Sequence, residues 1–114
     1  PYYEWYMLNG LDQKTFMFTL TPMSNFKDKD AYEVITKGIE STLKVTEGTL
    51  VQQKDMDYFK YPLREITFNT EYQSFRVRYF YDGNYLYQLL VSGKEGSIYE
   101  PDANRFLDGL RWSE

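Results

Sequence analysis

Apolar and polar residues alternate along six short stretches of the chain, and a two-residue period is typical of β-strands. The Asn9-Gly10 and Asp82-Gly83-Asn84 segments each separate two such stretches, and both are strong hairpin-turn signals. Pro22 ends the second stretch, because proline has no amide hydrogen to donate to a sheet ladder. The predicted strands are residues 2–8, 15–21, 50–56, 63–69, 74–81 and 85–91.

Two other segments have the three- to four-residue apolar period of an amphipathic helix. One begins after Asp30, which has the capping-box spacing from Glu33, and ends near Gly48. The other begins at Pro101, because proline suits the first helical position, and ends near Gly109. The apolar faces consist of Tyr32, Ile35, Ile39 and Leu43 in the first helix, and of Ala103, Phe106, Leu107 and Leu110 in the second.

The two strands around Asp82-Gly83-Asn84 carry apolar residues on both faces, as Phe80 between Tyr79 and Tyr81 illustrates. A strand with one face in water would have polar residues there, so we expect a helix on each face. Gly38 is predicted to mark a close approach of the first helix to the sheet. The sequence therefore predicts a single α+β domain, residues 1–114, in which an antiparallel six-stranded sheet has helices packed on both faces, an α/β/α sandwich.

The composition narrows the possible chemistry. The chain has no cysteine and no histidine, which excludes thiol nucleophiles, disulfides, imidazole bases and the usual zinc ligands. Its net charge of −4 contrasts with the basic surplus typical of nucleic-acid binders. No stretch approaches the ~20 apolar residues of a membrane-crossing helix. We therefore predict no catalytic residue, no metal, no cofactor, no nucleic-acid partner and no transmembrane segment.

Acidic residues offer an alternative. Asp55, Asp57 and Glu65 could line a cleft at the sheet, which would suit a small-ligand-binding domain or a carboxylate-based enzyme. The simpler interpretation of Glu65 is an ion pair across the sheet with Arg76 or Arg78. These two readings stay open at the level of the sequence.

Three short motifs resemble the PsbP-like superfamily. They are Tyr61-Pro62-Leu63-Arg64-Glu65, Leu86-Tyr87-Gln88-Leu89 and Arg105-Phe106-Leu107-Asp108-Gly109-Leu110, and the resemblance extends from about residue 15 to residue 112. The last motif departs from the family pattern, with Gly109 and Leu110 in place of Ser and Phe. The resemblance implies the fold of small bacterial lipoprotein-like domains, and hence a periplasmic, membrane-anchored or secreted location rather than a cytoplasmic one. It also implies binding to other proteins, an analogy at the level of the fold.

The aromatic residues, 19% of the chain with twelve tyrosines, are the strongest functional signal. Tyrosine, tryptophan and arginine dominate interface hot spots, and loops carry function more often than strands do. The leading hypothesis is a non-catalytic protein-interaction or assembly module of the bacterial envelope, which binds a protein partner or a neighbouring domain. A third hypothesis is single-stranded nucleic-acid binding by tyrosine stacking. The predicted binding residues are Tyr3, Trp5, Phe59, Tyr61, Arg76 and Arg78.

Overall fold

The computed structural model describes residues 3–9, 14–23, 30–58 and 61–109, and for residues 3–9, 57 and 58 it describes the backbone alone. The strands are β1 (Tyr3–Asn9), β2 (Lys14–Pro22), β3 (Thr49–Tyr58), β4 (Tyr61–Asn69), β5 (Ser74–Tyr81) and β6 (Tyr85–Gly93). The helices are α1 (Ala31–Thr46) and α2 (Pro101–Asp108), with the short 3₁₀ turn η2 (Ser97–Tyr99) just before α2.

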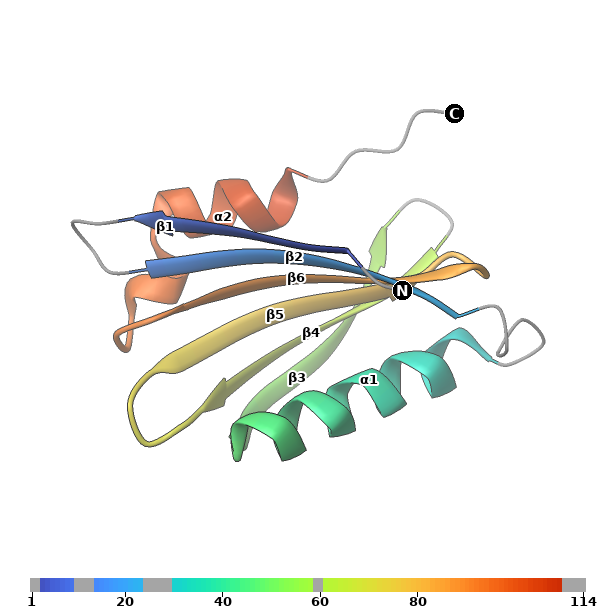
Figure 1. The fold of residues 1–114 in the computed structure, drawn as a ribbon, viewed down its shortest axis with the longest axis horizontal. Coiled ribbons are helices and arrows are strands. Elements are labelled where there is room, and N and C mark those ends of the chain that lie inside the picture. Colours follow the sequence, from blue (N-terminus) through green and yellow to red (C-terminus); the bar gives the residue numbers. More distant parts are fainter. Residues whose placement is uncertain (1–2, 10–13, 24–29, 59–60, 110–114) are drawn as a thin grey trace.

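The strands form one antiparallel sheet in the order β1-β2-β6-β5-β4-β3 (Figure 1). The predicted β5–β6 hairpin is confirmed, because the Asp82 carboxylate accepts hydrogen bonds from the backbone of Asn84 and Tyr85 and closes the turn. In this register Phe80 lies opposite Tyr87, and Arg78 lies opposite Leu89 and Glu65. The register thus decides which side chains share a face of the sheet.

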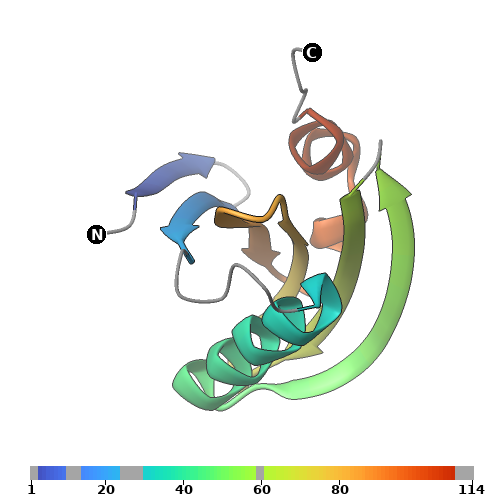
Figure 2. The ribbon, with the colours of Figure 1, turned by 90° about the vertical axis from the view of Figure 1, so that its right-hand side faces the viewer.

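Helix α1 lies on one face, and the sheet curls around it (Figure 2). The Asp30 side chain caps the helix by accepting a hydrogen bond of 2.7 Å from the backbone nitrogen of Tyr32. The close approach predicted at Gly38 is confirmed, since a Cβ atom there would lie 2.9 Å from Cδ2 of Leu86. The core on this face contains Val34, Ile35, Ile39, Ile66, Phe68, Phe75, Val77, Tyr79, Tyr81, Leu86 and Leu90.

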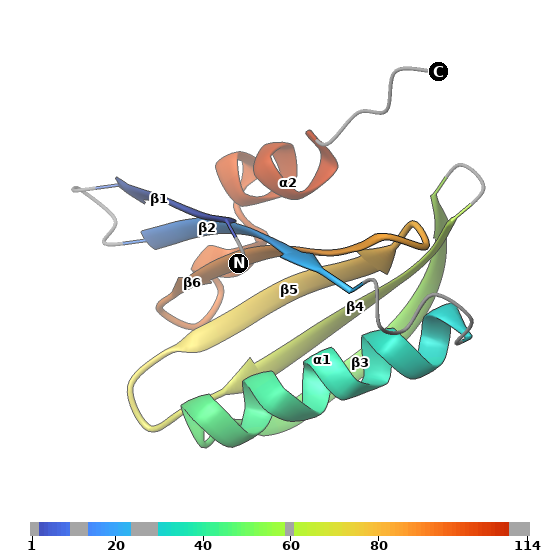
Figure 3. The same cartoon turned by 45° about the vertical axis from the view of Figure 1, so that its right-hand side comes forward.

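The second face carries a separate apolar cluster, to which α2 and η2 contribute only Ala103, Leu107 and Ile98 as buried residues. Helix α2 has eight residues and lies along β6, next to η2. Figure 3 shows it over one part of the sheet, away from the turn that joins β5 to β6. The strand residues of this cluster are Phe16, Leu63, Phe80, Leu89 and Val91.

The prediction of an α/β/α sandwich, in which helices pack on both faces of the sheet, is wrong. Only α1 forms a helical layer, and α2 is too short to cover the second face. Among the side chains that the structure describes, the buried strand residues of the two cores come from β2, β4, β5 and β6, and β3 adds the partly buried Met56. The physical reason is that apolar residues on both faces of a strand must be shielded from water, but their pattern does not determine whether a helix or other side chains shield them. On the second face, aromatic rings cover one another and charged side chains fill part of the surface.

Neither described helix combines the length and the apolar character that a membrane crossing requires.

Candidate functional site

Aromatic rings gather on the second face of the sheet, near the end where β5 turns into β6. Strand alternation places them there, because residues two apart on a strand share a face. We define the aromatic surface as Phe18 of β2, Met56 of β3, Tyr61 of β4, Phe80 of β5, and Tyr85 and Tyr87 of β6. Phe80 is fully buried and forms the floor, whereas the other five are half-buried or exposed.

Tyr87 is the centre of this surface. Its ring stacks on Phe80 with centroids 4.3 Å apart and planes 3° apart. Phe18 and Tyr85 each lie 6.4 Å from the same ring, and Tyr85 meets it edge-on. The Tyr87 hydroxyl donates a hydrogen bond of 2.9 Å to Asp82. Burial raises the pKa of Tyr87 above its ordinary value, and the Asp82 carboxylate raises it further, so the hydroxyl remains a donor.

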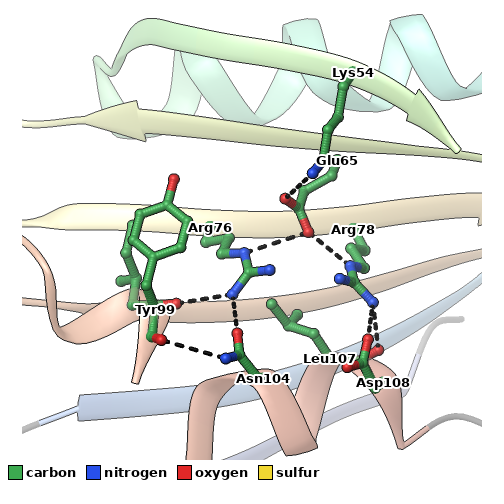
Figure 4. Close-up of polar contacts among 9 residues, drawn as sticks. Lys54, Glu65, Arg76, Arg78, Tyr99, Asn104, Leu107 and Asp108 are labelled. Carbon is green, nitrogen blue, oxygen red and sulfur yellow. Dashed lines mark hydrogen bonds and ion pairs between the residues drawn. The ribbon is translucent and has the colours of Figure 1, made fainter. Parts of the chain in front are cut away.

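A buried charge network borders the aromatic surface (Figure 4). Glu65 is 5% exposed and accepts a hydrogen bond of 2.7 Å from Nε of Arg78. Nε of Arg76 lies 3.3 Å from the same carboxylate, and Nζ of Lys54 lies 3.9 Å from its other oxygen. The predicted ion pairing of Glu65 across the sheet is therefore confirmed. It is a buried network, so removal of one partner would leave an uncompensated charge out of water.

Three basic side chains of the sheet hold η2 and α2 in place. The first is Lys14, at the start of β2, which is fully buried. It donates hydrogen bonds of 2.5 Å to Glu100 and 2.6 Å to Asp102, at the N-terminus of α2. Burial alone would lower the pKa of Lys14, but these two carboxylates outweigh it and raise the pKa above its ordinary value.

The other two basic residues bind further along the helix. Arg76 donates to Asn104 at 2.6 Å and to the carbonyl of Ile98 at 3.1 Å, and its guanidinium lies over the ring of Tyr99. Arg78 donates to Asp108 at 2.6 Å and to the carbonyl of Leu107 at 3.2 Å. The polar partners of the three cations include Glu100, Asn104 and Asp108, which are spaced four residues apart and so share one side of the helix.

The structure brings together some of the predicted binding residues and separates others. Tyr61 belongs to the aromatic surface. Trp5 pairs with Phe18 in the backbone register of β1 and β2, and Tyr3 pairs with Leu20, but their side chains lie outside the described atoms. Phe59 lies outside the described residues.

Arg76 and Arg78 were predicted to lie on a binding surface, but the structure buries both. They are 7% and 9% exposed and bind Glu65 and α2. Their guanidinium groups are therefore engaged inside the domain and do not form a surface for phosphate groups. Sequence reasoning missed Lys14, although the acidic residues at the start of α2 signal a basic partner on the sheet.

Two of the three acidic residues of the alternative hypothesis, Asp55 and Glu65, lie on opposite faces of the sheet. Asp55 points to the α1 face, where Nε of Arg64 donates to it at 2.6 Å, whereas Glu65 lies in the network on the second face. The side chain of Asp57 lies outside the described atoms. Within the described residues, no cluster of three or more acidic side chains is arranged to hold a metal ion.

Comparisons with known proteins show the fold and nothing more. No family model matches the chain, and no curated protein matches it significantly. A crystal structure of PA94, a Pseudomonas aeruginosa protein of unknown function whose description suggests a regulator, superposes with a TM-score of 0.72. The match covers 100% of this chain and 84% of that one at 12% sequence identity. The superposition shows a shared fold. At this sequence identity a shared fold does not imply a shared function.

Proposed function

We propose that this domain is a non-catalytic protein-interaction module and that the aromatic surface contacts the partner. The observation that carries the proposal is the cluster of half-buried rings around Tyr87 on the second face of the sheet, which α2 covers only in part. Tyrosine-rich patches suit binding, because each ring offers apolar area and a polar hydroxyl. The partner is another protein or a neighbouring domain.

Contacts within the domain hold the central ring of the surface in place, which supports a role in binding. The stack on Phe80 and the hydrogen bond to Asp82 fix the ring of Tyr87 at both ends. Ordering a side chain at an interface costs about 0.5–1.5 kcal/mol, and a ring that is already fixed avoids much of that cost. A preformed aromatic patch therefore favours specific docking.

The charges beside the surface are compensated within the domain. Glu65 neutralises Arg76 and Arg78 in part, and Asp108 pairs with Arg78. The surface therefore offers a partner neutral rings with hydroxyl groups at their edges. We expect the partner to contribute apolar or aromatic side chains and a few hydrogen-bonding groups, rather than a strongly charged patch.

Site-specific photo-crosslinking in the source cells tests this proposal. A benzophenone amino acid replaces Tyr85 or Tyr61 in separate variants, and Tyr72 serves as the control because it is 86% exposed in the β4–β5 turn. We expect discrete protein adducts from positions 85 and 61 and none of the same mass from position 72. Adding Phe18→Ser should reduce the adducts about tenfold, which corresponds to roughly 1.4 kcal/mol of binding energy. Equal labelling from all three positions would contradict the proposal.

A further inference from the structure

Strand β3 forms one edge of the sheet, and its outer side is unpaired in the part of the chain that the structure describes. Figure 2 shows the strand as the outermost ribbon, curving away from α1. An edge strand presents a row of backbone N–H and C=O groups that can pair with another strand. Natural proteins usually guard such edges with charges, prolines or very short strands.

The first half of β3 lacks these guards. Residues 49–53 contain no charged residue and no proline. Leu50 and Val51 are 43% and 62% exposed. A register shift between Leu50 and Gln52 leaves Val51 without a paired residue on β4. A bulge of this kind twists an edge, but here it also presents an aliphatic side chain to solvent.

The charges in the middle of β3 are neutralised by the neighbouring strand. Nζ of Lys54 lies 3.9 Å from Glu65, and the carboxylate of Asp55 binds Arg64 at 2.6 Å. Both partners belong to β4, one strand further into the sheet. The charges that would normally repel an incoming strand are therefore compensated by β4, although the side chains of Lys54 and Asp55 remain 54% and 51% exposed.

We infer that β3 accepts an extended segment of a partner protein by strand addition. The backbone groups of the edge determine that the segment is extended. The exposed Leu50 and Val51 favour aliphatic side chains in it, and the compensated edge favours uncharged residues at its centre. Because the domain carries a net charge of −4, basic residues at the ends of the segment assist the encounter. This surface is distinct from the aromatic surface, which lies on a face of the sheet.

The test uses a synthetic peptide of alternating valine and threonine with lysine at both ends. The control is the same peptide with N-methyl groups on alternate residues, which blocks one row of hydrogen bonds and leaves the side chains intact. We expect the unmodified peptide to bind at least tenfold more tightly by calorimetry, and to protect backbone amides of β3 from hydrogen exchange. Equal affinity of the two peptides, or protection of another element, would overturn the inference.

Two variants test whether the peptide binds at the edge formed by β3. Val51→Lys puts an uncompensated charge on an exposed position, and we expect it to weaken peptide binding at least tenfold. Asn84→Lys adds the same charge at a position that is also exposed but lies in the β5–β6 turn, which β4 separates from β3, and we expect it to leave binding unchanged. Identical effects of both variants, or self-association of the protein through β3 without peptide, would also overturn the inference.

Discussion

Removing the guanidinium of Arg78 should destabilise the domain more than any other single change in the charge network. Arg78→Met keeps most of the apolar stem but removes the donors to Glu65, Asp108 and the Leu107 carbonyl. Glu65 is only 5% exposed, so its carboxylate would lose its best partner while remaining out of water. Breaking a buried ion pair by removing one partner costs about 3–5 kcal/mol, and we expect a loss of unfolding free energy in that range.

Two comparisons distinguish the cost of leaving a buried charge without a partner from the energy of the ion pair itself. Asp108→Asn breaks the pair at its solvent side, and because the Asp108 side chain is 65% exposed we expect a loss of only about 0.2–1 kcal/mol. Glu65→Met combined with Arg78→Met replaces both charges by apolar side chains. Its cost should be at least about 2 kcal/mol less than the sum of the two single changes.

Urea denaturation followed by far-ultraviolet circular dichroism measures the wild type and four variants, Arg78→Met, Asp108→Asn, Glu65→Met and the double variant, and a slope equal to that of the wild type checks that unfolding stays two-state. The reasoning is refuted if Arg78→Met costs no more than Asp108→Asn. It is also refuted if the effects of the Glu65 and Arg78 changes simply add.

Three further predictions concern other parts of the fold. Gly48→Ala should lower the unfolding free energy by about 1–3 kcal/mol, because the new Cβ would lie 2.4 Å from the buried Phe68 ring; urea denaturation measures it. Tyr87→Phe should cost about 0.5–1.5 kcal/mol through loss of the hydrogen bond to Asp82, because the phenyl ring keeps the stack on Phe80, and urea denaturation measures the loss. Arg64 lowers the pKa of Asp55 from 3.8, so this pair stabilises the fold above that pH and the contribution disappears as the carboxyl is protonated. Asp55→Asn should therefore be less stable than wild type at pH 7 and equal to it at low pH.

Local sequence signals predicted the β5–β6 turn and the start of α1. Asp82 accepts the backbone bonds of its own turn, and Asp30 caps the helix that follows it, so each signal needs only neighbouring residues. The cover of the second face could not be predicted in this way. Apolar alternation in β5 and β6 indicates that both faces are covered, but whether a helix or stacked rings provide the cover depends on contacts between distant segments.

The candidate site was partly predictable for the same reason. Alternation places Tyr61 and Tyr87 on one face once the pairing of β4, β5 and β6 is known, and the hairpin turn supplies part of that pairing. Arg76 and Arg78 were predicted as binding residues, and their burial could not be predicted because it depends on contacts with α2. The four-residue spacing of Glu100, Asn104 and Asp108 could have indicated that the helix faces a row of cations.

The second face has a short helix, α2, and a group of half-buried rings around Tyr87, and the first of these features explains the second. Helix α2 buries only two residues, Ala103 and Leu107, which is a small apolar contact for an element that must keep a fixed position. Hydrogen bonds from Lys14, Arg76 and Arg78 supply the directional contacts that apolar packing lacks, because charge-assisted bonds specify geometry as well as energy. A helix that is held by such hydrogen bonds does not need a large apolar contact area with the sheet, so it can be short. The neighbouring rings around Tyr87 are consequently left half-buried, where a partner can reach them.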